Sequence, residues 1–582
     1  MSVPGAGLPD FPHRGALRAR NGWPEFLWYS AFLLLGLAAM SNSIADPDLW
    51  GHVQYGHEVL RDGHLHSTTT WSYAVQDYRW INHEIIAELV LAWVHDQGGQ
   101  TGLLILKAVM GILLLAIPLK VAVRESSSRL SALAVIILVS FMTAFHWHLR
   151  PHMFSYLCAA CLLAILTLCV PGVVRSRSTV PVNPRLMWLL PPLMTLWTNS
   201  HGGFLAGLAI LMAWLGLDAL DLIITRHPRT LQSLRNHSIV LSASGAATLL
   251  NPYGSGLHRW MLSSLGRPRP EISDWMPLDL VSRNAIPFWM LVMMVIVCIC
   301  SSRAEWRWPG SVIAALLAWQ ALSHCRHVPF LSLFCVFWLT PHFDSCVRNF
   351  AQRGRQRLDL METQVSPATE VREPGWLQTV VPPVLLMVIC SVILLPQMAT
   401  LRVDREAYPV DAMQFMADHR LSGNTLVTFN WAQYAIHVFA ETSPQSRVAI
   451  DGRFRTCYPQ QTIDTYFDFL LGDPAEQPRY REDASGPFDP DRALEERAPD
   501  LVLIEDELRP AILTLQRNAD DWVLLYRDQT AQLWGRRDRY DNPGSPFWLP
   551  PQQRQIQAGR TSASADYEAS FAAWPAVPHV RS

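Results

Sequence analysis

One stretch sets the class of this protein: WPEFLWYSAFLLLGLAAMSNSIADPDLW, residues 23–50. It begins with about twenty mostly apolar residues, the length of a helix that crosses a lipid bilayer, and it contains Asp46-Pro47-Asp48 near its end. The apolar part is too long for the core of a cleaved signal peptide, and further apolar segments follow it. We therefore expect an uncleaved membrane-spanning helix with two acids directly beyond its end.

The composition of the whole chain also indicates a membrane protein. Of its 582 residues, 50% are hydrophobic and only 16% are charged, well below the roughly 25% of soluble domains. Its 23 tryptophans suit the aromatic belts at bilayer surfaces. The net charge of −2 predicts no binding to nucleic acid.

Apolar segments long enough to cross the bilayer, some of them short or tilted, recur up to residue 397. The fold class that they predict is an α-helical integral membrane protein, with about eleven transmembrane helices in a domain at 23–397. We place these helices near 23–44, 101–123, 130–147, 152–171, 186–200, 203–224, 237–251, 286–302, 308–323, 328–342 and 376–396.

The distribution of arginine orients these helices. If residues 1–22 form a cytoplasmic N-terminus, the Arg-rich loops alternate onto the cytoplasmic side, as the positive-inside rule requires. The loop at 252–285 is the one expected outside loop with several arginines. A polar linker near 343–375 is expected in the cytoplasm, and an odd number of helices places the C-terminal part outside the cell.

The turns expected on the outer face carry His, Arg, Asn or an acid at a helix end. They are the first outer loop at 45–100, HLRPH (148–152), TNSHGG (198–203), NPYGSGLHRW (251–260) with EISDW (271–275), and SHCRH (323–327). A polar cluster drawn from several helix ends on one membrane face indicates a functional site. The alternative is that these ends are polar because they meet headgroups and water.

The composition becomes that of a soluble protein after Gln397. Short apolar stretches at 424–429, 447–450, 500–504 and 522–527 are typical of strands, and helical patterns lie between them. Alternating strands and helices predict a small extracytoplasmic α/β domain at 398–540. Residues 541–582, rich in Pro, Gln, Ser and Ala, are expected to form a disordered tail.

Within the first outer loop, the pattern predicts two amphipathic helices on the membrane surface. Asp46 is placed to cap the first of them, with Pro47 at its first position, and Asp48 would be favourable near the same N-terminus. The second is expected at 81–97, with Glu84 and Glu88 on its polar face. HEIIA (83–87) lacks the second histidine of a zinc-protease helix, so no metalloprotease is indicated.

Several motifs resemble those of a known class of enzymes. They are DPDLWGHVQYGHEVL (46–60), INHEIIAELVLA (81–92), LRPHMFSYL (149–157), WTNSHGGFLAGL (197–208), LLNPYGSGL (249–257), FNWAQYAIHVF (429–439) and VAIDGR (448–453). Together with a long first helix, an acid at its outer end and an outer C-terminal domain, they resemble the GT-C membrane glycosyltransferases. The resemblance extends over about residues 24–455, and it is closest to a bacterial GT-C-like group whose substrate is unassigned.

The resemblance implies roles for particular residues. The first-loop acid of the class acts as a general base on the acceptor hydroxyl or as a metal ligand, and here that acid is Asp46 or Asp48. Basic groups of the outer loops hold the donor phosphate, and these are Arg150, His152, His201, Arg326 and His327. The other implied residues are Asn199, Asn251 and Tyr253, which would orient sugar hydroxyls, Glu271 and Asp274 as a second carboxylate, and Asp451 and Arg453 on the acceptor side.

Simpler explanations stay open for several of these residues. HLRPH and SHCRH are also suited to anchoring in headgroups, NPYG to a turn that ends a helix, and DGRF (451–454) to a loop held by its own salt bridges. Several GT-C members have adjacent acids, whereas Pro47 separates them here, so one acid is expected to act in chemistry and the other to cap. A divalent metal is possible; the sequence holds no haem, nucleotide or zinc motif.

The function that the resemblance implies is the inverting transfer of a sugar from a polyprenyl-phosphate donor to an extracytoplasmic glycan, lipid or protein. The expected location is a bacterial inner membrane, with many membrane passes. The alternative is a non-catalytic scaffold or export component that kept the fold, in which the outer polar groups would not converge on one cavity. A transporter ranks last, because few ionisable residues lie deep in the predicted helices and no internal repeat is evident.

Overall fold

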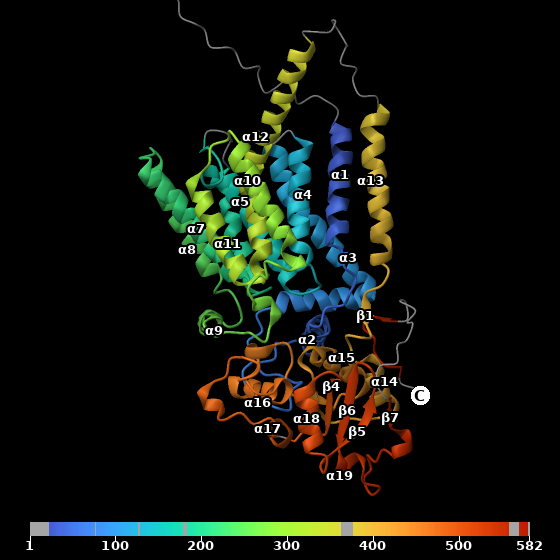
Figure 1. The fold of residues 1–582 in the computed structure, drawn as a ribbon. Helices are drawn as coiled ribbons and strands as arrows, with labels where there is room; N and C mark the ends of the chain where they lie inside the picture. Colours follow the sequence, from blue (N-terminus) through green and yellow to red (C-terminus); the bar gives the residue numbers. More distant parts are fainter. Residues whose placement is uncertain are drawn as a thin grey trace, which may run out of the picture.

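The computed structural model describes residues 22–75, 77–125, 128–177, 183–362, 376–496, 498–557 and 570–579. It contains a helical bundle, a layer of helices across one end of that bundle, and a C-terminal α/β domain beyond this layer (Figure 1). The N-terminus expected in the cytoplasm lies outside the described residues except for Gly22, and so do residues 363–375 of the expected linker. Up to Glu362, that linker is helical, because it continues the last long helix of the bundle core.

Seven helical segments among the described residues are long and apolar enough to cross a membrane. They belong to the helices α1 (Gly22–Met40), α3 (Ile85–Glu125), α5 (His152–Cys169), α7 (Phe204–Ile224), α10 (Ile286–Ser301), α12 (Val328–Glu362) and α13 (Trp376–Gln397). The other predicted spans are also helices, but these are shorter or more polar: α4 (Arg129–Ala144), α6 (Leu190–Thr198), α8 (Thr230–Ala247) and α11 (Trp308–Ser323). The count of about eleven spans therefore stays a prediction.

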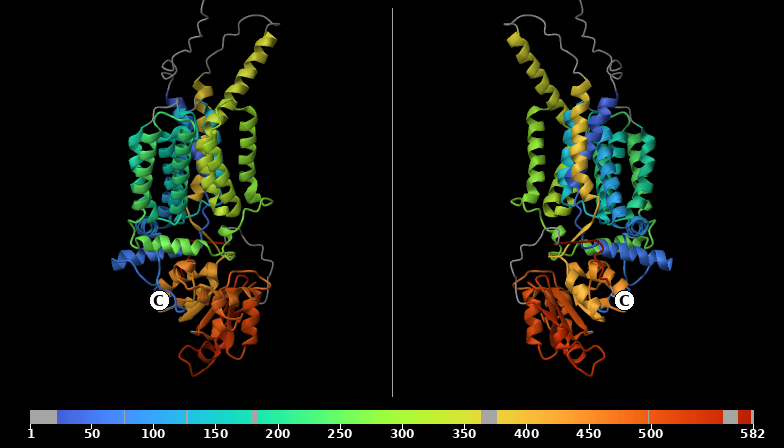
Figure 2. Two further views of the ribbon diagram at one scale, coloured as in Figure 1. Left: turned by 90° about the vertical axis from the view of Figure 1, so that its left-hand side faces the viewer. Right: turned by 90° about the vertical axis from the view of Figure 1, so that its right-hand side faces the viewer.

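The layer at the end of the bundle consists of α2 (Leu49–Asp62), the first half of α3, and α9 (Ser255–Leu265) (Figures 1 and 2). The amphipathic helix expected at 81–97 and the span expected at 101–123 form one element, α3. It changes direction at Gly99, whose φ of 55° is readily adopted only by glycine. The chain therefore enters the bilayer directly from the surface helix.

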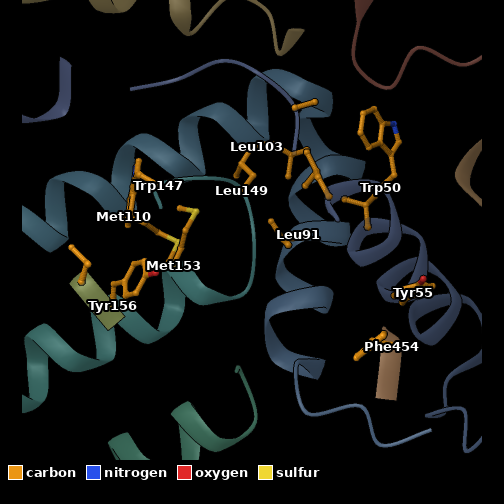
Figure 3. Close-up of a cluster of buried hydrophobic side chains, with 14 of the residues drawn as sticks. Trp50, Tyr55, Leu91, Leu103, Met110, Trp147, Leu149, Met153, Tyr156 and Phe454 are labelled. Atoms are coloured by element: carbon orange, nitrogen blue, oxygen red, sulfur yellow. The ribbon is translucent and has the colours of Figure 1, made fainter. Parts of the chain in front are cut away.

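Helix α2 is buried rather than lying on a free membrane surface. It packs against α3 at Gly56, where a Cβ atom would lie 2.3 Å from the carbonyl oxygen of Glu88. Trp50 and Tyr55 are fully buried beside it, and Figure 3 shows Tyr55 near Phe454 of the C-terminal domain. The prediction of a surface helix is corrected here, because the C-terminal domain covers the face that was expected to meet water.

The C-terminal domain is built on a six-stranded sheet with the order β3-β2-β4-β6-β5-β7. The strands are β2 (Asn424–Val427), β3 (Arg447–Val448), β4 (Leu501–Glu505), β5 (Trp522–Arg527), β6 (Ala531–Arg536) and β7 (Gln555–Ile556). β2 is parallel to β3 and β4, whereas β6 is antiparallel to β4 and β5. Helices α14 (Val410–Asp418), α15 (Ala432–Thr442), α16 (Gln460–Leu471) and α18 (Arg509–Arg517) accompany the sheet.

The described part of 541–582 differs from the expected disordered tail. β7 pairs with β5, and β8 (Phe571–Ala573) pairs with β1 (Arg402–Asp404). Trp574 is buried, and the carbonyl oxygen of Pro575 accepts a hydrogen bond of 2.9 Å from the indole of Trp50. Residues 570–579 thus join the C-terminal domain to helix α2.

Candidate active site

A cavity of about 700 Å³ lies where the bundle, the helical layer and the C-terminal domain meet. Turns that are far apart in the sequence contribute to its wall, and each of them was expected on the outer face. Its predicted site residues are Asp46, Asp48, Arg150, His152, His201, Asp274, Arg326, His327 and Arg453. The structure therefore brings together side chains from five outer turns of the membrane domain and, with Arg453, from the C-terminal domain.

Arg150, which follows α4, is the centre of the acidic side of the cavity. Its guanidinium contacts three carboxylates: Nε donates to Asp46, Nη2 lies 3.2 Å from Oδ2 of Asp48, and Nη1 lies 3.3 Å from Oδ2 of Asp274. Burial alone would lower the pKa of Arg150, but the three carboxylates outweigh it and raise the pKa. Three acids around one arginine leave a negative excess, so at least one carboxylate remains available to a ligand.

The two acids of the opening stretch differ in their surroundings. Asp46 is 6% exposed, and its Oδ1 accepts from Arg150 and from the backbone N–H of Asp48 at 3.0 Å. Asp48 is 29% exposed, toward the cavity, and burial followed by the charge of Asp46 raises its pKa even though Arg150 opposes this. Helix α2 begins at Leu49, two residues later than expected, so both acids lie before the helix and reach the same arginine.

The C-terminal domain closes the cavity over Asp48. The amide nitrogen of Gln433, in the orientation that its neighbours require, donates to the backbone oxygen of Asp48 at 2.8 Å and to its Oδ1 at 3.3 Å. A Cβ atom on Gly452 would lie 2.6 Å from Oδ1 of Asp48. Both residues come from motifs that carry the resemblance, FNWAQYAIHVF and VAIDGR, and they fix the position of this carboxylate.

A second polar group on the wall contains His52, Glu84 and Glu88. Nδ1 of His52 lies 3.4 Å from Glu88 and 4.0 Å from Glu84, and Asn82 donates to Glu88 at 2.6 Å. Burial opposes charge on His52, but the two glutamates outweigh it and raise the pKa of the imidazole. Burial lowers the pKa of the neighbouring His201 to about 3, which keeps that ring neutral.

These three side chains have the donor set of a divalent metal. Their ligand atoms lie within 4.8 Å of one another, and one imidazole with two carboxylates suits a borderline metal such as Zn²⁺ or Mn²⁺. His52, Glu84 and Glu88 therefore fit the divalent metal that the resemblance allows. The sequence analysis had named Asp46 or Asp48 as the possible metal ligand and did not predict this group.

Another part of the cavity wall is basic and aromatic. The guanidinium groups of Arg269 and Arg326 lie 4.3 Å and 4.6 Å from the centre of the Trp275 ring. Arg326 forms no ion pair within the described part of the chain. Burial, together with the charges of Arg455 and Arg326, lowers the pKa of Arg269 to about 10, so an anion between these groups would relieve their repulsion.

The cavity continues as an apolar groove into the bundle. One wall comes from α7 and the other from α11, and Phe330 at the start of α12 also lines the cavity. The lining residues of the two walls are Leu205, Ala206, Ala209, Ile210 and Ala213, and Ile313, Leu316 and Leu317. Small alanines on α7 leave width for an unbranched or isoprenoid chain, so the cavity offers a polar head and an apolar tail to one ligand.

Several predicted residues lie outside the cavity and are used by the fold. Asn199 donates to the backbone oxygens of Thr195 and Leu250, each at 2.8 Å. The amide of Asn251 is occupied by the turn 248–254, which agrees with the simpler explanation for NPYG.

The remaining predicted residues are also engaged within the protein. The hydroxyl of Tyr253 accepts from the N–H of Asn82, and Glu271 accepts from the N–H of Tyr480. Asp451 is fully buried, and its carboxylate accepts from Arg453 at 2.7 Å and from Tyr458 at 2.5 Å. Asp451 therefore holds Arg453 at the wall and does not itself face an acceptor.

Sequence reasoning missed His52, Gln433, Gly452, Arg269 and Trp275. Glu84 and Glu88 carried a usable signal, since residues four apart share one face of a helix, and His52 lies one turn after the acids. For Gln433 and Gly452 the signal was their presence in the motifs quoted above. Arg269 and Trp275 carried none, because no motif or spacing distinguishes them within the loop between α9 and α10.

Comparison with solved structures identifies the architecture. The chain is similar to ArnT from Cupriavidus metallidurans bound to undecaprenyl phosphate, with 12% identity and a TM-score of 0.50 over 91% of this chain and 100% of that one. The chain has a GT-C-like fold. It is a multi-pass membrane protein, and the resemblance of its sequence to the GT-C class is thereby confirmed.

Two more distant likenesses involve the same class. One is to the archaeal oligosaccharyltransferase AglB from Archaeoglobus fulgidus in complex with an inhibitory peptide and a dolichol-phosphate (10% identity, 84% and 70% of the two chains, TM-score 0.48). The other is to the arabinofuranosyltransferase AftD from Mycobacteria (13% identity, 88% and 40%, TM-score 0.44). At these identities the likeness concerns the fold. No protein-family model and no curated protein matches the chain.

Proposed function

We propose that this protein is a membrane glycosyltransferase that transfers a sugar from a polyprenyl-phosphate donor to an extracytoplasmic acceptor. The acceptor is a glycan, a lipid or a protein, and the enzyme acts in a bacterial inner membrane with its N-terminus in the cytoplasm and its C-terminal domain outside. The observation that carries the proposal is the form of the cavity. Its head holds carboxylates and arginines, and its apolar groove runs between α7 and α11.

The general base in this proposal is Asp48. Asp46 is occupied by Arg150 and by the backbone of Asp48, whereas the carboxylate of Asp48 is 29% exposed to the cavity. Its raised pKa makes it a stronger base than an ordinary carboxylate, while Arg150 holds it in place. Asp46 acts as a positioning residue for Arg150.

The donor phosphate is assigned to Arg326 and Arg269 rather than to Arg150. A phosphate at Arg150 would meet three carboxylates within 3.3 Å of the guanidinium, and like charges this close oppose binding. Arg326 and Arg269 stack on Trp275 without an ion pair among the described residues. Their guanidinium groups suit the charge-assisted hydrogen bonds that phosphate oxygens accept.

The reaction then follows as one displacement. Asp48 takes the proton of the acceptor hydroxyl, the acceptor oxygen forms a bond to the anomeric carbon, and the bond from that carbon to the phosphate oxygen breaks. The phosphate leaves with the electron pair, and Arg326 and Arg269 stabilise its growing charge. A single displacement inverts the anomeric configuration. A metal held by His52, Glu84 and Glu88 would supply further positive charge beside the reacting sugar.

The test is complementation of a strain that lacks the gene, with polyprenyl-phosphate-linked sugars measured by mass spectrometry of the lipid extract. The deletion strain should accumulate such a lipid, and the wild-type gene should remove it. Asp48→Asn should leave the accumulation in place, because loss of a general base lowers turnover by on the order of 10²–10⁴-fold. Asp62→Asn, an exposed acid at the far end of α2, is the matched control and should complement fully.

The outcomes separate the parts of the proposal. Absence of any accumulated lipid in the deletion strain would contradict the donor class. Removal of the accumulated lipid by Asp48→Asn, to the same extent as by the wild-type gene, would contradict the role of Asp48 as base. A deletion strain whose lipids equal those of the parent strain would favour the scaffold alternative. That alternative expects outer polar groups that do not converge, whereas the cavity gathers them.

A further inference from the structure

A second cluster of histidine and carboxylate lies on the far side of the α2–α3 contact, outside the cavity. Nε2 of His57 lies 2.7 Å from Oδ1 of Asp96, and Nδ1 of His95 lies 3.9 Å from the same oxygen. The three ligand atoms lie within 4.8 Å of one another. Neither the proposed reaction nor the predicted site uses any of them.

The crossing of the two helices explains why these side chains meet. Gly56 of α2 packs on Glu88 and Ala92 of α3. One residue beyond Gly56, His57 therefore faces the next turn of α3, which carries His95 and Asp96. The rigidity of a buried crossing fixes these positions before any ligand binds, and preorganised ligands are what a metal site requires.

The surroundings of the cluster favour a cation over a simple ion pair. His57 and Asp96 already make a hydrogen bond, yet Nδ1 of His95 is buried and has no hydrogen-bond partner among the described residues. Trp574 stands edge-on to His95 with ring centres 5.1 Å apart and shields it from water. Nδ1 of His95 and Oδ1 of Asp96 are 3.9 Å apart, which is too far for a hydrogen bond. A metal ion between these two atoms could bind both of them.

We propose that His57, His95 and Asp96 bind a divalent transition metal of the Zn²⁺ type. Ligand atoms around a tetrahedral zinc lie roughly 3.3 Å apart, and the observed separations of 2.7 and 3.9 Å lie on either side of this value. Imidazole nitrogens with one carboxylate select such a metal over Mg²⁺ or Ca²⁺, which prefer oxygen. Water takes the fourth position, since Asp96 is 48% exposed.

The metal would join α2 to α3 at the end of α2 that lies away from Asp48. It would also lie next to the segment around Trp574, which packs on Trp50 and on His437. The site is therefore structural, and it connects the C-terminal domain to the helix that begins beside the proposed base. Its occupancy does not depend on the proposed function.

The test is zinc stoichiometry of the full-length protein in detergent, measured by mass spectrometry after dialysis against Zn²⁺. Because His52, Glu84 and Glu88 can hold a metal of their own, the variants must distinguish the two places. His57→Ala and His95→Ala should each lose one equivalent relative to wild type, and each should lose one equivalent again when made in a His52→Ala background, compared with His52→Ala alone. His66→Ala is the matched control, since His66 pairs with Asp62 at 3.0 Å but belongs, among the described residues, to no group of three ligand atoms within 4.8 Å of one another.

Thermal unfolding gives an independent measurement. In a His52→Ala background, Zn²⁺, but not Mg²⁺, should raise the unfolding temperature of the otherwise unchanged protein and of His66→Ala. It should fail to raise that of His57→Gln and Asp96→Asn, which roughly keep the volume of the side chain. Equal zinc content in wild type, His57→Ala and His95→Ala would overturn the proposal. An equal loss in His66→Ala would overturn it too, because it would show adventitious binding.

Discussion

The two ends of the helical bundle carry the same kinds of charged residue in opposite arrangements. At the end away from the C-terminal domain, Asp221 accepts from Arg177 and Arg307 at 2.5 Å each, and Arg177 also reaches Asp218 at 2.5 Å. Both aspartates are almost fully buried, and Arg307 also pairs with the exposed Glu305 at 2.8 Å. Within the described residues, each acid and each arginine of this cluster has an ion-pair partner.

At the cavity end the charges are separated instead of matched. Arg150 is shared by three carboxylates, whereas Arg326 and Arg269 lie against Trp275 and form no ion pair among the described residues. The difference teaches that the number of charged residues at a membrane face does not mark a site. What marks it is a cavity whose wall holds carboxylates in excess of their arginine together with arginines that have no acid partner.

The largest effect is expected from removing the central arginine at either end. Arg150→Met and Arg177→Met should each lower the free energy of unfolding by about 3 kcal/mol, because each leaves buried carboxylates without their partner. Only Arg150→Met should also abolish complementation at a temperature where both variants remain folded. Denaturant unfolding of the purified variants and lipid analysis of the complemented strain measure the two effects.

The two variants Arg150→Met and Arg177→Met also define the results that would contradict this comparison. If Arg177→Met abolished complementation while folded, the cluster around Asp221 would have a function of its own. If Arg150→Met were as active as wild type, the acidic side of the cavity would not be part of the machinery. Arg150→Lys should recover part of the activity, because it restores the charge without the three-way geometry.

An intermediate effect is expected from crowding the base. Gly452→Ala places a Cβ atom 2.6 Å from Oδ1 of Asp48 and 2.5 Å from the side-chain amide of Gln433, so one of these groups must move. A displacement of this kind should lower the rate about tenfold or more, since misplacement by about 1 Å costs up to 10² in rate. Gly245→Ala, where the added Cβ meets no atom within 4 Å, is the control for the rate measurement.

The smallest effect is a shift of the pH dependence. The rate requires ionised Asp48, so it should fall as the pH drops through a pKa that burial and Asp46 raise above the usual carboxyl range. Asp46→Asn removes one of these causes and should move the acidic limb of the rate to lower pH, by up to roughly one unit. A limb that stays in place or moves to higher pH would contradict Asp48 as the titrating base.

Much of this architecture could be predicted from the sequence. Long apolar segments specify membrane helices almost by themselves, and an arginine pattern that alternates from loop to loop places the outer turns on one face. Asp46, Arg150 and Arg326 were found in this way. The resemblance supplied the class, and the strands at 424–427 and 501–505 followed from their apolar character.

The rest depended on contacts between distant segments. The pattern of α2 is amphipathic in the same way as a surface helix, and only the C-terminal domain reveals that His52 is buried against Glu84 and Glu88. The segment around Trp574 has the composition of a disordered tail, yet its indole packs on α2. Asn199 and Asn251 were chosen for their chemistry, but backbone carbonyls at helix ends occupy them.

The central claim is that the basic side of the cavity holds the lipid phosphate and the apolar groove holds its chain. The most direct measurement is a structure of the protein with undecaprenyl phosphate added. A phosphate oxygen should lie at hydrogen-bond distance, about 3 Å, from Arg326 or Arg269, with the isoprenoid chain between α7 and α11. A phosphate bound at Arg150, or a chain outside this groove, would contradict the account.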